Sequence, residues 1–210
     1  YTVMLEHLVE IASRELGAPV SQAVLTVPVE VDELGQRQLE LAASKAGLDV
    51  LALLPEPVAA ALTLVPEEQK TRITAVVDFG GGSFDVCILS MPPEADSGLT
   101  VLGAAGDRWL GGADFDRLLA DVSAEEFFRV TGHRFETATE DLRLLQACEA
   151  AKRRLSTLDA TEVILPKAAN SDGFDKTLNV PFRRNDLALI GRKLVESAVD
   201  ICHRALSAAE

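Results

Sequence analysis

A glycine-rich turn between two apolar runs carries the residues best suited to chemistry in this sequence. Residues 73–89 read Ile-Thr-Ala-Val-Val-Asp-Phe-Gly-Gly-Gly-Ser-Phe-Asp-Val-Cys-Ile-Leu, which predicts two buried strands joined by a turn at Gly80–Gly82. Three glycines let a ligand approach the backbone and let successive N–H groups point at an anion. Asp78 ends the first strand, Ser83 lies on the turn and Asp85 opens the second strand. Carboxylates beside bound phosphate are the setting that a hard divalent cation requires.

The same turn also fits a plain β-hairpin whose aspartates are solvated, so the phosphate interpretation does not follow from the turn alone. The turn is not a P-loop, because no Gly-Lys-Ser/Thr follows it. It is not a dinucleotide fingerprint either, since a predicted strand and not a helix comes after the glycines.

The periodicity of apolar residues predicts alternating helices and strands around this hairpin. Caps are expected at Asp32, Asp114, Thr139 and Asn185, and a linker or hinge at 65–72. Loops are expected at 92–98, around His133 and Phe135, and at 170–173. Helices are predicted at 2–16, 32–46, 57–61, 115–131, 139–156 and 185–208, and further strands at 22–27, 50–54, 99–105, 161–165 and 177–182.

A polar stripe follows one face of the predicted helix at 139–156. Glu149, Lys152, Arg153 and Ser156 recur at helical spacing, so they share one face. One interpretation is a solvated face on which Glu149 pairs with a basic neighbour. The other is a purine and ribose site, in which Arg153 stacks on the base while Glu149 and Lys152 bond sugar hydroxyls.

Composition narrows the classes of function. The 210 residues carry a net charge of −13, which argues against binding to nucleic acid or to an anionic membrane surface. Three widely separated cysteines, Cys87, Cys148 and Cys202, form no metal motif and no obvious disulfide framework, and they favour a cytoplasmic location. No apolar run has the length of a membrane span. The chain begins at Tyr1 in what reads as mid-helix, so we expect a segment of a longer protein.

Several motifs together resemble the seventy-kilodalton heat-shock chaperones, the DnaK family. Residues 78–85, Asp-Phe-Gly-Gly-Gly-Ser-Phe-Asp, resemble the second phosphate loop of that family. Further segments resemble the family's motifs in the same order over nearly the whole chain: Val27-Pro28 with Gln36-Arg37-Gln38, Glu-Pro-Val-Ala-Ala-Ala at 56–61, the Gly-Asp and Leu-Gly-Gly segments with Asp-Phe-Asp at 106–116, and Cys148-Glu149 with Lys152-Arg153 and Leu155-Ser156.

The resemblance implies an α/β fold of the actin-like ATPase (ribonuclease H-like) class, present in part. Residues 1–70 would be the later half of the base subdomain of lobe I, and 71–111 the start of the base of lobe II. Residues 112–185 would be the upper subdomain of lobe II, and 186–210 a helix returning to its base.

The resemblance also implies a role for each matching residue, with ATP or ADP and Mg²⁺ as cofactors. The catalytic set would be Glu56, Asp78 and Asp85, with Asp78 and Glu56 holding the metal through water. The implied ligands of the β- and γ-phosphates are Gly80, Gly81, Gly82 and Ser83; those of adenosine are Glu149, Lys152, Arg153 and Ser156; and Pro28 and Arg37 would couple nucleotide state to the substrate domain.

The sequence departs from the family pattern at a few positions. Ala113 stands where the family has glutamate, Glu30-Val31 replaces an aromatic pair, and Asn185-Asp186 replaces an aromatic-acidic pair. The first phosphate loop, a catalytic lysine and the last adenosine segment of the family lie outside these residues. We therefore expect the 210 residues alone to be inactive, although the parent chain would be an ATP hydrolase.

The function implied by the resemblance is the ATP-binding and ATP-hydrolysing part of a stress-response chaperone. Its expected partners are unfolded polypeptide clients, co-chaperones and nucleotide exchange factors, and the isolated segment is expected to self-associate through exposed apolar surface. The alternative is a non-catalytic nucleotide-binding or interaction module of the same fold. A sugar kinase or filament protein is a third possibility, but the Cys-Glu-x-x-Lys-Arg-x-Leu-Ser pattern is not expected there.

Overall fold

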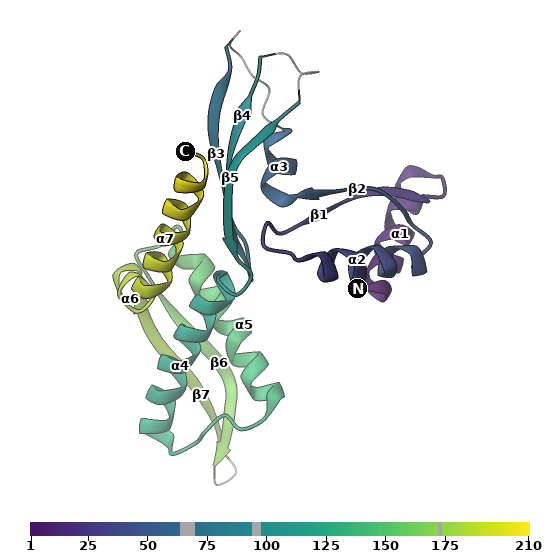
Figure 1. Ribbon diagram of the computed structural model, residues 1–210. Helices are drawn as coiled ribbons and strands as arrows, with labels where there is room; N and C mark the ends of the chain where they lie inside the picture. The colour runs from purple at the N-terminus through teal and green to yellow at the C-terminus, as the bar shows by residue number, and fades with distance from the viewer. Residues whose placement is uncertain (64–69, 94–97, 172–173) are drawn as a thin grey trace. The chain divides into compact units, whose positions relative to one another are not determined.

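The structure is a computed structural model that describes residues 1–63, 70–93, 98–171 and 174–210. Helices and strands are interspersed along the chain, which makes this an α/β protein (Figure 1). The chain divides into two compact units: residues 1–79, 83–108 and 201–210 form the first, and residues 80–82 and 109–200 form the second.

The N-terminal part of the first unit is a parallel strand pair with two helices. Strand β1 (Gln22–Val27) pairs with β2 (Asp49–Pro55). Helices α1 (Thr2–Leu16) and α2 (Glu33–Lys45) contribute Leu5, Ala42 and Ala43 to a small core that also includes Leu48. Asp32 caps α2 by accepting a hydrogen bond from the Gly35 N–H at 2.8 Å, which confirms the cap expected from the sequence.

The same unit also contains a three-stranded antiparallel sheet. Its order is β3 (Arg72–Phe79), β4 (Phe84–Met91) and β5 (Thr100–Asp107). The central strand β4 is almost entirely buried, and its Cys87, Leu89 and Met91 pack with Ala61 of helix α3 (Glu56–Ala61). At Gly103 a side chain would collide with the backbone near Ala205, so a glycine is required for the end of the last helix to lie against β5.

The second unit consists of helices packed on a β-hairpin. Strands β6 (Ala160–Ser171) and β7 (Phe174–Arg183) pair antiparallel, and α4 (Gly112–Thr131) and α5 (Ala138–Leu155) pack against them (Figure 1). Helices α6 (Arg184–Ile190) and α7 (Arg192–Ala208) follow, and α7 from Ile201 onward belongs to the first unit. The shared core includes Leu119, Leu144, Cys148, Val163 and Leu178, all at most 2% exposed.

The structure confirms most predicted elements and corrects several boundaries. Strand 22–27 and helix 2–16 agree with β1 and α1 residue for residue. The strands predicted at 161–165 and 177–182 are longer, because the hairpin continues beyond a register irregularity between Leu165 and Ala169. The expected linker at 65–72 and loops at 92–98 and 170–173 fall partly outside the described residues; Arg72 already belongs to β3, and Asn170 and Ser171 belong to β6.

Three expected helix caps are wrong. Helix α4 begins at Gly112, and Asp114 lies within its first turn, where its carboxylate accepts from the Gly111 N–H at 2.8 Å. The single helix expected after Asn185 is two helices separated at Gly191. The first of them begins at Arg184, because Asp186 accepts from the Arg183 N–H at 2.7 Å and closes the start of α6.

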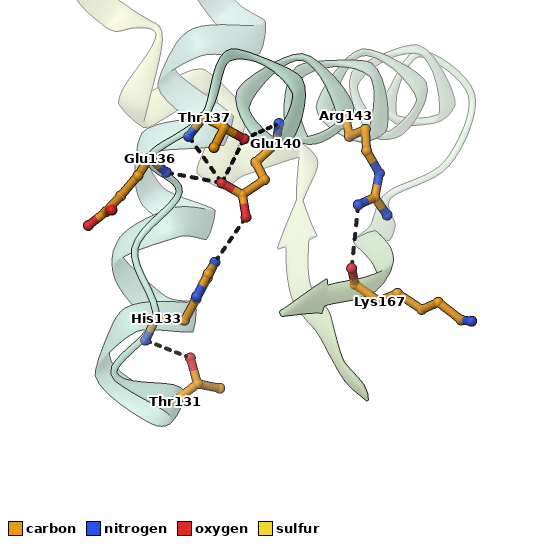
Figure 2. A network of polar contacts seen from close by, with 7 residues as sticks. All are labelled: Thr131, His133, Glu136, Thr137, Glu140, Arg143 and Lys167. Atoms are coloured by element: carbon orange, nitrogen blue, oxygen red, sulfur yellow. Dashed lines mark hydrogen bonds and ion pairs between the residues drawn. The ribbon is translucent and has the colours of Figure 1, made fainter. Parts of the chain in front are cut away.

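The cap of α5 is Thr137 and not Thr139. The Thr137 hydroxyl accepts from the Glu140 N–H at 3.2 Å, and a Glu140 carboxylate oxygen accepts from the Thr137 N–H at 3.0 Å (Figure 2). This reciprocal capping box satisfies two backbone donors that the helix itself leaves unpaired. His133 Nε2 lies 3.5 Å from the other Glu140 oxygen.

Among the described residues, no helix combines the length and apolar character needed to span a membrane. The three cysteines are free thiols, and Cys87 and Cys148 are buried.

Candidate functional site

The glycine-turn hairpin places its two aspartates opposite each other. Asp78 of β3 pairs in register with Asp85 of β4, and Phe79 pairs with Phe84 at the last position before the turn. Asp85 is only 1% exposed, whereas Asp78 is half-buried. A carboxylate at this depth is costly unless hydrogen bonds or a cation compensate for the lost hydration.

Asp85 is only partly compensated by the described residues. One carboxylate oxygen, Oδ1, accepts a hydrogen bond from the Val29 N–H at 3.0 Å. The other oxygen, Oδ2, is buried and has no hydrogen-bond partner within the described chain. At Gly106 of β5 a side chain would collide with Asp85 Oδ1, so the missing Cβ makes room for this carboxylate.

Glu30 is a neighbouring carboxylate that sequence reasoning did not assign to the site. Its Oε1 accepts from the Gly106 N–H at 3.1 Å, and Arg204 donates to the Gly106 carbonyl oxygen at 3.1 Å. Together with the bond from Val29 to Asp85, these contacts join the segment after β1 to the ends of β4 and β5. The only signal in the sequence was that Glu30 departs from the family's aromatic residue.

The clustered carboxylates in this unit oppose each other's ionisation. Burial, followed by the charges of Asp85 and Asp78, raises the pKa of Glu56. Burial is also the largest cause that raises the pKa of Asp85; the Val29 N–H acts in the opposite direction, and Asp78 and Glu30 add to the increase. The site therefore carries uncompensated negative charge, to which a bound cation would be complementary.

The described residues contain no group of three or more His, Cys, Asp or Glu placed to ligate a metal ion together. The water-mediated contact of Asp78 and Glu56 with a metal ion, which the family resemblance implies, stays a prediction.

In the second unit, the glycine turn contacts the start of α4. The Gly112 N–H donates to the Gly80 carbonyl oxygen at 3.0 Å, and the Ala113 N–H donates to that of Gly81 at 2.8 Å. A Cβ at Gly111 would lie 2.5 Å from the Gly81 carbonyl oxygen and 2.6 Å from the Gly82 nitrogen, which is closer than non-bonded atoms can approach. The second glycine segment of the sequence therefore packs directly on the first.

The polar stripe of α5 divides into two parts. Lys152 is 22% exposed and pairs with Asp116 at 2.8 Å, whereas Arg153 is 77% exposed and lies 3.8 Å from Glu149. Ser156 is exposed at the end of the helix. The Glu149–Arg153 pair is the kind of contact expected of a solvated face, and it leaves both side chains accessible to a ligand.

The two residues predicted to couple domains lie in the first unit. Pro28 and Glu56 line the same hollow of about 660 Å³. Arg37 is exposed on α2, where its guanidinium lies 3.5 Å from Glu33. Their coupling role stays a prediction.

Comparison with known proteins identifies the family. The family model described as Hsp70 protein matches residues 1–210. A curated relative, the chaperone protein dnaK of Cyanophora paradoxa, is 41% identical over 182 residues, which cover 84% of this chain and 29% of the relative. The chain therefore belongs to the Hsp70 family. It spans less than a third of the length of the curated relative that it matches.

Proposed function

We propose that this chain contributes part of the ATP-binding and ATP-hydrolysing domain of a DnaK-like chaperone. The fold would be actin-like, with 1–70 in the base of lobe I, 71–111 and 186–210 in the base of lobe II, and 112–185 in its upper subdomain. Membership of the Hsp70 family over residues 1–210 supports this proposal.

The observation that carries the proposal is the carboxylate cluster at the glycine-turn hairpin. Asp78 and Asp85 are paired across two strands, and both raise the pKa of Glu56. A structural hairpin gains nothing from a nearly inaccessible carboxylate, Asp85, whose second oxygen has no hydrogen-bond partner among the described residues. The free-energy cost of burying the Asp85 carboxylate is explained if the site binds a cation together with a phosphate group.

Each residue then has a distinct task in the proposed site. Asp78 and Glu56 would hold the water shell of Mg²⁺, an ion that supplies charge neutralisation at the phosphates when bound. Glu56 would also help to place the attacking water, and Asp85 would assist catalysis; positioning of this kind is the main protein contribution to phosphoryl transfer. Backbone N–H groups at Gly80, Gly81 and Gly82, with the Ser83 hydroxyl, would hold the β- and γ-phosphates. Glu149, Lys152, Arg153 and Ser156 would hold adenosine.

The whole protein would couple this site to clients in a separate domain. Pro28 and Arg37 would transmit nucleotide state, and unfolded polypeptides, co-chaperones and nucleotide exchange factors would be its partners. We propose a cytoplasmic, stress-responsive role without binding to nucleic acid or membrane, in keeping with a net charge of −13.

The test is hydrolysis of ATP by the full-length protein and by its Asp78→Asn variant. We expect the variant to bind ADP but to hydrolyse ATP about a hundredfold more slowly, because it removes one of the charges that organise the metal's water shell. Asp200→Asn, an exposed change on α7, is the control and should leave turnover unchanged.

Normal turnover by Asp78→Asn would overturn the catalytic assignment. Binding of ADP by a wild-type protein that does not hydrolyse ATP would instead favour the non-catalytic module. That alternative draws support from Ala113, which replaces the family's glutamate.

A further inference from the structure

A partly buried ion pair joins the two long helices of the second unit. Lys152 Nζ of α5 lies 2.8 Å from Asp116 Oδ2 of α4, and the two side chains are 22% and 11% exposed. The same two helices are also joined by Arg117 and Asp141, at 2.8 Å, with side chains 49% and 44% exposed. One pair is therefore shielded from water and the other is solvated.

The Lys152 ammonium is held by two acceptors. Besides the Asp116 carboxylate, it donates to the Gly112 carbonyl oxygen at 2.7 Å. A Cβ at Gly112 would lie 3.1 Å from Lys152 Nζ, so glycine keeps this approach open. An ammonium has three N–H donors. Within the described part of the chain, two of them are used by these acceptors, and the third is available to an acceptor on a ligand.

This arrangement connects the polar stripe of α5 with the glycine turn. Gly112, whose carbonyl oxygen accepts from Lys152, donates its own N–H to Gly80 at 3.0 Å. The ammonium is thus fixed relative to backbone that contacts the turn, and Asp116 supplies the charge that keeps it there. Sequence reasoning placed Lys152 in the site but did not identify Asp116.

We propose that Asp116 is a positioning residue that holds the Lys152 ammonium so that its remaining N–H is presented to a ribose hydroxyl of a bound adenine nucleotide. This inference rests on the proposed function, because it names the partner that sets one contact of that nucleotide site.

A purely structural role explains the pair less well. Buried ion pairs contribute little to stability compared with apolar side chains of the same shape, and Arg117–Asp141 already links the helices. Asp116 Oδ1 is buried and has no hydrogen-bond partner within the described residues, which is a further cost. A role in holding Lys152 accounts for a carboxylate at this position.

The experiment measures binding of ADP, 2′-deoxy-ADP and 3′-deoxy-ADP to the full-length protein by calorimetry. The variants are Asp116→Asn, Lys152→Met and the double variant. Asp141→Asn is the matched control, because it breaks the exposed pair between the same helices and leaves Lys152 untouched.

We expect Asp116→Asn to weaken ADP binding about tenfold, the loss typical of one charge-assisted hydrogen bond. One of the two deoxy analogues lacks the hydroxyl that Lys152 contacts. The ratio of the affinities for ADP and for that analogue should fall in Asp116→Asn to the ratio measured for Lys152→Met. The double variant should bind ADP no more weakly than Lys152→Met alone, because Asp116 acts through Lys152. Asp141→Asn should retain the wild-type affinity and preference.

If Asp116→Asn prefers ADP to both deoxy analogues by the same factors as the wild-type protein, the inference is overturned, even if the melting temperature of the variant falls. Additive losses in the double variant would also overturn it. If Asp116→Asn does not fold, Asp116→Glu provides the same test, since it keeps the charge but displaces the ammonium by one methylene. A wild-type protein that binds no ADP would overturn the proposed function and this inference with it.

Discussion

At the scale of single residues, the buried carboxylate of Asp85 lowers the stability of the folded protein at neutral pH. Its carboxylate is 1% exposed and one oxygen is unpaired within the described chain. Burial is the main reason why its pKa is raised above the ordinary value of 3.8. A raised pKa in the folded state means that folding favours the protonated acid. The contribution of Asp85 to the free energy of unfolding is therefore greatest below the ordinary pKa, and it declines as the pH rises through the folded-state pKa.

Replacing this carboxylate by an amide should stabilise the protein at neutral pH. We expect Asp85→Asn to raise the free energy of unfolding by about 1–2 kcal/mol at pH 7, because no charge is then buried and the amide oxygen still accepts from Val29. The gain should shrink as the pH falls through the raised folded-state pKa of Asp85 toward its ordinary value of 3.8. Denaturant unfolding at a series of pH values measures this.

The exposed Asp200→Asn should change the free energy of unfolding by no more than about 0.5 kcal/mol at pH 7. A loss of stability in Asp85→Asn at pH 7 would show that the carboxylate is better compensated than its contacts indicate.

At the scale of elements, helix ends depend on which of several polar residues takes the cap. Thr137 and Thr139 both precede the apolar face of α5, and only Thr137 bonds Glu140 reciprocally (Figure 2). The choice follows from the loop after His133, which brings the chain to the helix with Thr137 in an extended conformation (φ −103°, ψ 146°).

Two threonine substitutions test this assignment. Thr137→Ala should lower the free energy of unfolding by about 1 kcal/mol, the cost of losing an N-cap hydroxyl. Thr139→Ala should have little effect or stabilise slightly, because alanine is the better helix former inside the first turn. Thermal unfolding of the two variants side by side gives the comparison; a larger loss at Thr139 would restore it as the cap.

The contact between the two glycine segments is a second feature at this scale. A Cβ at Gly111 would meet the backbone of Gly81 and Gly82, whereas a Cβ at Gly81 would meet nothing within 4 Å. Backbone atoms cannot rotate away as a flexible side chain does. The tolerance for alanine should therefore differ strongly between these positions.

We expect Gly111→Ala to lower the free energy of unfolding by about 3 kcal/mol, and Gly81→Ala to change it by less than about 1 kcal/mol. Chemical denaturation reports both. Under the proposed function, Gly81→Ala should still weaken ADP binding, because its side chain would occupy space beside the phosphates. Equal stability of the two alanine variants would contradict the close approach.

At the scale of the whole molecule, the first unit exposes many apolar side chains. Its β1–β2 sheet has only two parallel strands, an arrangement rarely stable without further strands or covering layers. The exposed large apolar side chains of α1 and α2 include Val3, Met4, Leu8, Leu16, Leu34 and Leu41, at 79%, 59%, 52%, 73%, 64% and 57%.

We therefore expect the 210-residue chain to self-associate, because contact between copies would cover this apolar surface. Sedimentation velocity over a concentration series should show a rising average mass. The double variant Leu8→Lys, Leu34→Lys should reduce association, whereas Leu189→Lys, at an even more exposed apolar position of the second unit, should not. A monodisperse wild-type monomer at high concentration would contradict this expectation.

Local patterns in the sequence determined most helices, most strands and the glycine-turn hairpin, because apolar periodicity and glycine act over a few neighbouring residues. They also determined which residues are candidates for phosphate, metal and adenosine contacts. Only the tertiary structure decided that Glu30 reaches Gly106, that Asp85 is buried and bonded to the Val29 N–H, and that Lys152 pairs with Asp116. Those contacts join residues 36 to 76 positions apart, and no local pattern specifies which distant backbone or carboxylate a side chain will meet.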